Sequence, residues 1–336
     1  LTVPFGDSAS VGVGGITLGG GIGVLARTMG LISDNLTRVE MVVAAGERDA
    51  SLIVADAYEN PELFWACRGG GGGSFGVATA FTFALHPVSD QVPIYDVYWG
   101  WDDAATVLET WQRLAPEADE RFGSMLELFS KSVGRHRMHG VFLGTEDDLR
   151  QILQPLLAIG APDVTIKTVP YLDATRFLTD SPAARHAVDR SPLNIKFSSA
   201  WALAPLSRDA IERCCRYLEN ESADAFSMFF LNMGGAMRRL SADATAFPHR
   251  RASFYLEWDA RWTRPASEGA AVTAVELMRL ALQPFVTGSY VNVPDPGIPD
   301  WQDAYFGANA PRLRRVKAQY DPNNVFRFAQ SIPPEE

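Results

Sequence analysis

Glycine is concentrated near the start of this chain, and this feature constrains the fold more than any other. One series of glycines begins at residue 12 and ends at residue 23, and a second includes the uninterrupted run Gly69–Gly73. Glycine lacks a Cβ, so repeated glycines let backbone N–H groups approach a ligand closely and form a nest that binds anions. We therefore expect a fold built around a large phosphate-bearing ligand, although the run Gly69–Gly73 could also serve only to make turns.

Composition limits the classes of protein that this chain can represent. Its 336 residues are 47% hydrophobic, which is enough for two domains with substantial cores. The net charge of -10 argues against a nucleic-acid partner, because nucleic acids are bound by basic surfaces. No apolar run is long enough to predict a membrane span. The compartment stays undetermined, because the chain begins at Leu1 and no signal-peptide pattern follows. We interpret the chain as a fragment, a processed form or a trimmed form of a longer protein.

The three cysteines and the histidines give no sign of a metal site. Cys67, Cys214 and Cys215 have neither the spacing of a disulfide framework nor that of metal ligands, and we interpret them as small core residues. His136 and His139 lack a third ligand nearby in the sequence. No metal is therefore expected.

The pattern of apolar residues changes twice along the chain. Residues 1–88 alternate short β-like runs with glycine turns, whereas residues 89–286 group strands together with helices between them, and residues after 286 become rich in turns again. Such grouping favours an α+β fold with an antiparallel sheet covered by helices. The expected strands are residues 39–44, 51–55, 77–85, 124–131, 139–143, 225–232 and 253–262. The expected helices are residues 60–66, 102–114, 206–218, 300–317 and one that opens at residue 145.

Two details of this pattern can be tested directly. Residues 45–47 predict a hairpin turn, and the continuous apolar run that begins at Val77 is typical of a strand buried on both faces.

The segment Gly21–Ala26 fits the dinucleotide pattern G-x-G-x-x-A, but a Rossmann unit requires an apolar strand immediately before the first glycine. A glycine-rich stretch precedes it here, so an NAD-dependent dehydrogenase is the less favoured alternative.

The strand expected at residues 253–262 is the best candidate for chemistry. Alternation places Phe254, Leu256, Trp258 and Ala260 on one face. The other face carries Tyr255, Glu257, Asp259 and Arg261. Because three of these four side chains are charged, that face is either exposed to solvent or lines an active-site cavity.

A set of motifs in fixed order extends over nearly the whole chain, and together they resemble one family. The sequence is similar to the berberine-bridge-enzyme-like branch of the FAD-linked oxidases, within the superfamily of vanillyl-alcohol oxidase and p-cresol methylhydroxylase (PCMH). The motifs that carry the resemblance are Val11–Gly15, Gly19–Gly23, Gly30–Leu36, Glu59–Ala66, Arg68–Val77, Phe247–Arg250, Tyr290–Asn292 and Tyr320–Phe326.

The resemblance implies a two-domain fold and an FAD cofactor. Residues 1–88 and 287–336 would form the FAD-binding domain, with residues 89–286 inserted between them as the substrate domain. Relatives also carry a further N-terminal segment, which supplies a phosphate-binding loop and a histidine linked to the flavin. That segment would be absent here or supplied as a separate piece. Relatives with a second covalent link have cysteine where this chain has Ser8, so no cysteinyl link is expected.

The resemblance also assigns roles to individual residues. Glu257 matches the general base and Tyr255 a neighbouring residue that assists it, whereas Val293 stands where many relatives have tyrosine or histidine. His249 would be structural, and Arg238 and Arg239 would lie on the surface or at a domain interface. The residues expected to contact the cofactor are Gly12, Gly14, Gly15, Gly20, Gly21, Gly23, Gly76, Val77, Tyr290 and Asn292.

The function that follows is an FAD-dependent oxidase of a small organic substrate. The substrate would be an alcohol, a sugar or a natural-product intermediate, and oxygen would accept the electrons. The alternative is a truncated fragment that binds without catalysis or holds no flavin.

Overall fold

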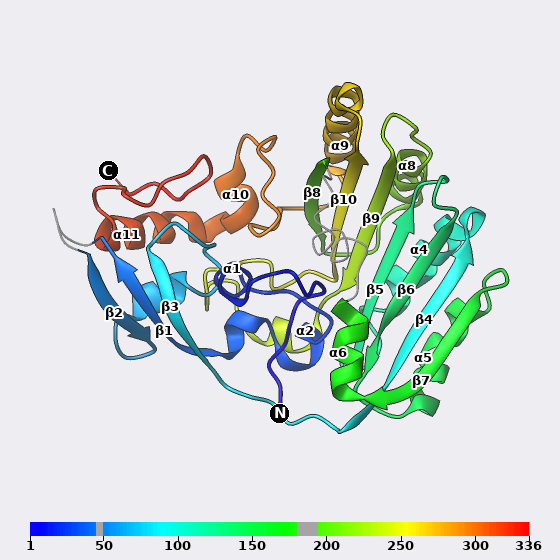
Figure 1. Ribbon diagram of the computed structural model, residues 1–336, viewed down its shortest axis with the longest axis horizontal. Coiled ribbons are helices and arrows are strands. Elements are labelled where there is room, and N and C mark those ends of the chain that lie inside the picture. The colour runs from blue at the N-terminus through cyan, green and yellow to red at the C-terminus, as the bar shows by residue number, and fades with distance from the viewer. Residues whose placement is uncertain (45–49, 180–193, 336) are drawn as a thin grey trace.

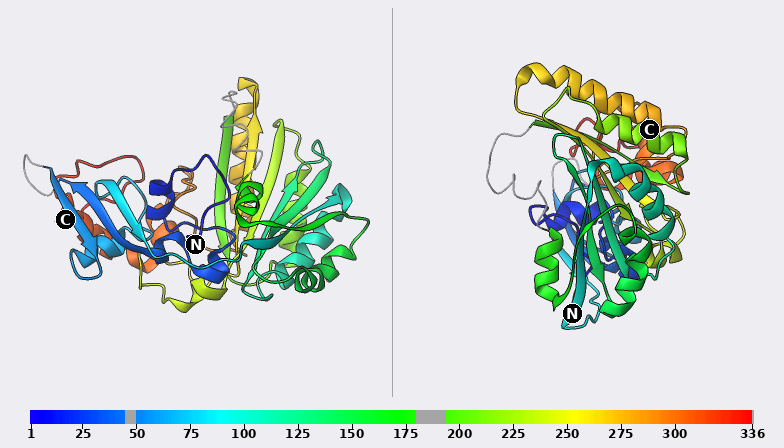
Figure 2. Two further views of the ribbon diagram at one scale, coloured as in Figure 1. Left: turned by 60° about the horizontal axis from the view of Figure 1, so that its bottom comes forward. Right: turned by 90° about the vertical axis from the view of Figure 1, so that its right-hand side faces the viewer.

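The computed structural model describes residues 1–44, 50–179 and 194–335 and contains two separate antiparallel sheets (Figure 1). A three-stranded sheet has the order β2-β1-β3, and a seven-stranded sheet has the order β7-β4-β6-β5-β9-β10-β8. The N-terminal segment lies between the two sheets (Figure 2). This arrangement confirms the predicted α+β class. The hairpin turn predicted at residues 45–47 lies outside the described residues.

The small sheet consists of β1 (Leu36–Val43), β2 (Ser51–Asp56) and β3 (Val77–Phe83). Helices α3 (Pro61–Ala66) and α11 (Ala310–Tyr320) share one hydrophobic core with β1. The prediction that the third strand is buried on both faces is wrong, because β3 is largely exposed or half-buried and the Val77 side chain is 57% exposed. Its apolar composition favours a strand, but burial depends on which elements pack against it.

Both ends of the chain contribute to that core. Leu18 and Phe75 from the first part pack with Leu313 and Ile332 from the last part. The buried Lys317 ammonium donates to the Ser74 carbonyl (2.6 Å) and pairs with Asp321 (2.5 Å), which ties the C-terminal motif to the glycine run. Residues 242–246 of the middle part also reach this region, where the Asn309 amide donates to three of their carbonyls.

The seven-stranded sheet carries helices mainly on one face. Trp111, Cys214 and Trp258 belong to the core between the sheet and the helices on that face, whereas α6 packs on the opposite face. The strands are β4 (Gln91–Gly100), β5 (Phe122–Phe129), β6 (Arg135–Phe142), β7 (Asp163–Pro170), β8 (Asn194–Ala202), β9 (Ala225–Asn232) and β10 (Phe254–Trp262). The helices are α4 (Ala104–Leu114), α5 (Glu146–Leu157), α6 (Tyr171–Thr179), α8 (Arg208–Leu218) and α9 (Glu268–Leu282).

Local sequence signals explain where several helices begin. The hydroxyls of Thr145 and Ser207 accept backbone N–H groups three residues later and cap α5 and α8. The single helix predicted over residues 300–317 is instead divided at Gly307, whose φ of 49° is costly for residues with a Cβ. The remaining short elements are α1 (Val13–Leu18), α2 (Ala26–Met29), η1 (Ile32–Asn35), η2 (Trp101–Asp103), η3 (Gly235–Arg239), η4 (Pro265–Ser267), α10 (Trp301–Phe306) and η5 (Gly307–Asn309).

Within the described residues, each helix is too short or too polar to span a lipid bilayer.

Candidate active site

A cavity of about 390 Å³ lies where the N-terminal segment, the face of the large sheet and the C-terminal segment meet. Three distant parts of the sequence contribute to its lining. Six of the proposed catalytic and cofactor residues lie there: Gly12, Gly15, Tyr255, Glu257, Tyr290 and Asn292. The cavity therefore brings the two proposed catalytic residues together with four of the proposed cofactor residues.

Strand β10 presents part of its charged face to this cavity and its apolar face to the core. Leu256 and Trp258 are buried against the helices, whereas Tyr255 and Glu257 line the cavity. Of the two environments that the alternation left open, the structure places Glu257 in a cavity and not in bulk solvent.

Glu257 is a carboxyl group with a strongly perturbed proton affinity. Burial disfavours its charged form and raises its pKa to about 8. The Tyr255 hydroxyl donates to Glu257 Oε2 (2.8 Å) and opposes part of that shift, because it stabilises the carboxylate. Tyr255 itself is buried, which raises its pKa well above the usual value and keeps it a donor. The pair can hold or accept a proton near neutral pH.

Tyr290 and Asn292 join the C-terminal segment to the first glycine series. The Tyr290 hydroxyl accepts from the Gly21 N–H (3.1 Å) and from Asn292 Nδ2 (2.9 Å). Asn292 Nδ2 also donates to the Ile16 carbonyl (3.2 Å). These bonds fix the position of the Asn292 amide beside the open glycines of the cavity.

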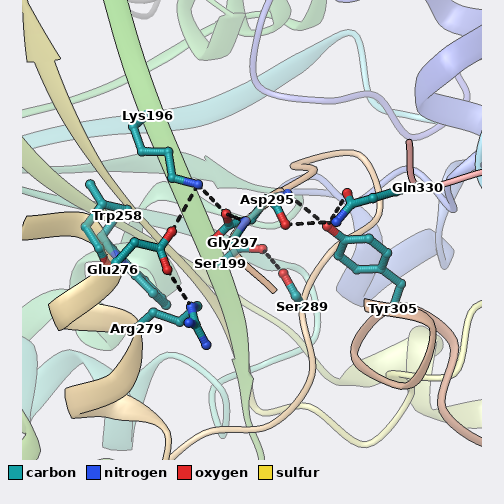
Figure 3. Close-up of polar contacts among 11 residues, drawn as sticks. Lys196, Ser199, Trp258, Glu276, Arg279, Ser289, Asp295, Gly297, Tyr305 and Gln330 are labelled. Carbon is teal, nitrogen blue, oxygen red and sulfur yellow. Dashed lines mark hydrogen bonds and ion pairs between the residues drawn. The ribbon is translucent and has the colours of Figure 1, made fainter. Parts of the chain in front are cut away.

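The edge strand β8 fixes the position of this C-terminal segment relative to Glu257. Ser199 pairs in register with Glu257, and its hydroxyl accepts the Tyr290 N–H (3.1 Å) and bonds to the Ser289 hydroxyl (2.9 Å). Further along β8, Lys196 pairs with the buried Asp295 and with Glu276 of α9 (3.2 Å), as Figure 3 shows. The strand that aligns the proposed base thus also aligns the segment that bears Asn292.

The glycines of the first series differ in what surrounds them. A Cβ at Gly12 or Gly15 would meet no atom within 4 Å, so these two are open to the cavity. A Cβ at Gly20, Gly21 or Gly23 would collide with Phe247, Ile32 or the Phe5 carbonyl, respectively. Close packing of the chain accounts for these last three glycines, and their contact with a cofactor stays a prediction.

The remaining cofactor residues lie elsewhere. Gly14 faces the Phe81 ring, Gly76 is packed against the Val42 carbonyl, and Val77 lies on the exposed strand β3. Their role also stays a prediction. The run Gly70–Gly72 lines another cavity, of about 290 Å³, which shares Gly15 and Asn292 with the first. The interpretation that these glycines make turns also stays open, because Gly71 has a φ of 85°.

The histidines and arginines to which the sequence assigned no catalytic or cofactor role lie outside the first cavity. His249 stacks on Trp201 with 4.8 Å between ring centroids, and burial lowers its pKa to about 4. His136 and His139 point to opposite faces of β6, because they are three positions apart in the strand. Among the described residues, no group of three His, Cys, Asp or Glu is arranged to hold a metal ion. Arg239 pairs with Glu120 at the surface (2.6 Å), and Arg238 donates to the Ser253 hydroxyl (3.0 Å).

Sequence reasoning missed part of the site. Asp7 lines both the first cavity and a neighbouring one of about 320 Å³, and Glu127 and His139 line the neighbouring one. A signal for Glu127 was present, because it is the only charged residue among the apolar positions of β5. Asp7 gave no comparable signal, since it lies in a segment without periodicity.

Comparison with known proteins identifies the family. The family model described as berberine and berberine like matches residues 289–333. The uncharacterized FAD-linked oxidoreductase YvdP of Bacillus subtilis is 46% identical over 98% of this chain and 73% of its own length. The chain belongs to the berberine-bridge-enzyme-like family of FAD-linked oxidoreductases.

Solved structures agree with this assignment. CrmK, a flavoenzyme of caerulomycin biosynthesis, has a TM-score of 0.88 and 29% identity, with 100% of this chain and 77% of CrmK covered. Berberine bridge enzyme from Eschscholzia californica has a TM-score of 0.87 and 25% identity, with 100% and 72% covered. These neighbours confirm the predicted PCMH-type fold and identify the protein as an FAD-linked enzyme.

The residues present fit a flavin. Gly12 and Gly15 leave open space in which a planar ring can approach the backbone, and the Asn292 carbonyl oxygen offers an acceptor, because its Nδ2 already donates to Tyr290 and Ile16. The two cavities share Gly15 and Asn292 in their linings.

Proposed function

We propose that this enzyme oxidises a hydroxyl-bearing small molecule, with FAD as hydride acceptor and oxygen as final electron acceptor. The observation that carries the proposal is the position of Glu257, a half-buried carboxyl with its pKa raised to about 8, in the cavity lined by Gly12, Gly15 and Asn292. A proton acceptor is needed there, because removing hydride from a carbon that bears a hydroxyl requires loss of the hydroxyl proton.

Each residue of the site has a defined task. Glu257 accepts the hydroxyl proton of the substrate, and the Tyr255 hydroxyl stabilises the carboxylate that accepts it. Tyr290 and Asn292 hold the cofactor edge, and the apolar Ile22, Leu231 and Val293 restrict water. The flavin, when bound, supplies the hydride acceptor. Val293 offers no hydrogen-bonding group, so Glu257 and Tyr255 supply the proton chemistry.

The covalent state of the flavin is part of the proposal. Ser8 stands where a second link would need a thiolate, and Cys67 and Cys214 are buried in the two hydrophobic cores. Burial raises the pKa of the Cys67 thiol to about 12, which keeps it protonated and unreactive. Mass spectrometry of the holoenzyme should find no flavin on any cysteine.

A flavin-free binding fragment is the competing function. The purified protein should be yellow, with the flavin absorbance band near roughly 450 nm. A colourless protein that folds but cannot be loaded with FAD would favour the fragment, and joining a preceding segment that restores the colour would show that cofactor binding needs that segment.

The decisive experiment replaces Glu257 by glutamine in the flavin-loaded protein. Glu257→Gln keeps the shape of the side chain and removes the proton acceptor, so anaerobic flavin reduction by an alcohol should slow by roughly 10²–10⁴. Flavin content should stay the same. Glu212→Gln, on the exposed face of α8, is the matched control and should reduce flavin at the original rate. Reduction of Glu257→Gln at the rate of this control would show that Glu257 is not the base.

A further inference from the structure

The side chain of Trp201 on β8 lies behind the two tyrosines of the active site. Trp201 pairs in register with Tyr255, so both side chains lie on the cavity face of the large sheet. The indole centroid lies 4.9 Å from the centroid of the Tyr255 ring and 5.8 Å from that of the Tyr290 ring. Trp201 itself is fully buried and does not line the catalytic cavity. The indole therefore supports both tyrosines without facing a ligand in that cavity.

The same indole also packs on the loop that precedes β10. The Phe247 ring meets it edge-on with 5.4 Å between centroids, and the His249 ring stacks on it. Phe247 fills the space that a Cβ at Gly20 would need, so this loop lies against the first glycine series. Burial lowers the pKa of His249 to about 4, so the stacked imidazole is neutral near pH 7. The contacts of Trp201 thus reach the glycine segment through Phe247.

The backbone of Trp201 holds the start of the C-terminal segment. Its N–H donates to the Thr287 carbonyl (2.9 Å), and its carbonyl accepts the Thr287 N–H (2.9 Å). Thr287 lies three residues before Tyr290, whose hydroxyl accepts the Gly21 N–H. One residue of β8 therefore contacts β10, the loop at Phe247 and the segment that carries Tyr290. A smaller side chain at this position would loosen parts of the site that come from three regions of the sequence.

The position of the Tyr255 ring controls the proton affinity of Glu257. That ring is enclosed by Trp201, Tyr290 and Phe229, at centroid distances of 4.9, 5.8 and 6.4 Å. Its hydroxyl donates to Glu257 Oε2 (2.8 Å) and opposes the rise in pKa that burial of Glu257 causes. A hydrogen bond weakens steeply when its length or angle departs from the optimum. A ring that tilts into space behind it would therefore stabilise the carboxylate less well.

Other titratable groups also lie around Glu257. They come from the N-terminal segment and from β5, β6 and β10: Asp7, Glu127, His139, Asp259 and Arg261. All five line the neighbouring cavity of about 320 Å³, which Trp201 does not line. A substitution at Trp201 should therefore reach Glu257 through Tyr255 and leave these groups in place.

We propose that Trp201 is a positioning residue of the active site, whose indole holds the Tyr255 hydroxyl against Glu257. The inference rests on the proposed function, because Glu257 is the base that Trp201 would tune through Tyr255. The full width of the indole fills the space between the rings of Tyr255, Phe247 and His249. A smaller side chain leaves a gap there, into which the Tyr255 ring can tilt.

Titration of Glu257 in the flavin-loaded protein tests this role without turnover. Infrared absorption of the protonated carboxyl, with Glu257→Gln as the blank, follows the ionisation of Glu257 alone. Trp201→Phe and Trp201→Leu should each move this titration to higher pH by about 0.5–1 unit, because the hydrogen bond from Tyr255 weakens. Trp201→Phe keeps an aromatic ring and serves alone if the leucine variant does not fold. A titration that stays in place would overturn the proposal.

Trp99→Phe is the matched control. Trp99 is 1% exposed and belongs to the core between the large sheet and its helices. Within residues 1–44, 50–179 and 194–335, the indole N–H groups of Trp99 and Trp201 both lack a hydrogen-bond partner, so the two substitutions remove equivalent groups. Trp99→Phe should leave the titration of Glu257 in place. An equal shift in both variants would indicate a general loosening of the fold and would overturn a role specific to Trp201.

A double substitution shows whether Trp201 acts through Tyr255. Tyr255→Phe removes the hydroxyl that donates to Glu257, so adding Trp201→Phe to it should change the titration of Glu257 little further. Shifts that add in full in the double variant would show that Trp201 reaches Glu257 by another route, and would overturn the proposal.

Anaerobic flavin reduction separates this inference from the proposed function. If both hold, the pH profile of flavin reduction in Trp201→Phe should move with the infrared titration, at unchanged flavin content. A shifted titration together with a rate that Glu257→Gln leaves unchanged would contradict the proposed function and support the positioning role. An unshifted titration in Trp201→Phe would overturn the positioning role, whatever the outcome for Glu257→Gln.

Discussion

The two faces of β10 show how one strand meets two different requirements. Trp258 is 1% exposed, and its indole N–H donates to the Val275 carbonyl of α9 (3.1 Å). The adjacent Glu257 points the other way, into the cavity, beside Tyr255. Burying the indole stabilises the fold, because apolar surface leaves water. Burying the carboxyl costs stability and provides a proton acceptor of unusual affinity. We expect substitutions on the two faces to separate stability from turnover.

The largest effect is expected on the core face. Trp258→Ala should lower the free energy of unfolding by about 3–5 kcal/mol, because it leaves a cavity under α9. Flavin reduction per folded, flavin-loaded molecule should change far less than in Glu257→Gln. Urea unfolding and anaerobic reduction measure the two quantities, and Trp258→Phe serves if the alanine variant does not fold. A selective loss of turnover in a fully stable Trp258 variant would contradict the separation of stability and turnover between the two faces of β10.

The second effect is the pH dependence of the free energy of unfolding and of the rate of flavin reduction. The pKa of Glu257 is about 8 in the folded protein against an ordinary value of 4.5, so folding favours the protonated form. As the pH rises from 4.5 to about 8, the unsubstituted protein should lose stability relative to Glu257→Gln. Above that range, the difference in the free energy of unfolding between the two proteins should stay constant. The rate of flavin reduction should rise over the pH range around 8, because only the carboxylate accepts a proton. A rate that falls through that range would contradict the role of base.

A smaller effect is expected from the partner of Glu257. Tyr255→Phe removes the hydroxyl that donates to Glu257 Oε2, so the pKa of Glu257 should rise further and turnover at neutral pH should fall about tenfold. The pH profile of flavin reduction should move to higher pH. Tyr95→Phe is the matched control, since the Tyr95 hydroxyl is also buried but donates to the Gly123 carbonyl (3.0 Å). If both variants leave the profile in place, Tyr255 does not tune the base.

The smallest effect is expected at the edge strand. Ser199→Ala removes the acceptor of the Tyr290 N–H and should cost about 1 kcal/mol of stability. Because Ser199 is opposite Glu257, the flavin absorbance spectrum should also shift as the Asn292 segment moves. Ser198→Ala changes the neighbouring residue on the other face of β8 and should leave the spectrum unchanged. Identical spectra for both variants would show that β8 does not align the segment.

Local patterns in the sequence predicted four strands of the large sheet, β5, β6, β9 and β10, and missed β4, β7 and β8. The alternation from Phe254 to Arg261 predicted both faces of β10 because a strand has a strict period of two. Thr145 and Ser207 were expected to open helices, and each hydroxyl accepts the N–H that its position requires. These features depend on neighbours a few residues away, so a single sequence contains them.

The patterns failed where distant segments decide the outcome. Gly12 and Gly20 belong to the same glycine series in the sequence. A Cβ at Gly12 would meet open space, whereas the Phe247 ring occupies the position of a Cβ at Gly20. Glu127 and Glu257 are far apart in the chain, and only strand pairing through Phe229 puts them in one row. The apolar run of β3 predicted burial, which depends on elements that pack against it.

The sequence by itself determined the family, through a resemblance carried by ordered motifs that implies FAD and a base at Glu257. The period of one strand, a local property, put Glu257 and Tyr255 on the same face. Only the tertiary structure decided which glycines are open, how β8 ties Tyr290 to the strand of Glu257, and that a second polar cavity adjoins the first. The physical reason is that burial, and with it the pKa of a carboxyl, is set by everything that surrounds a side chain and not by its neighbours in the chain.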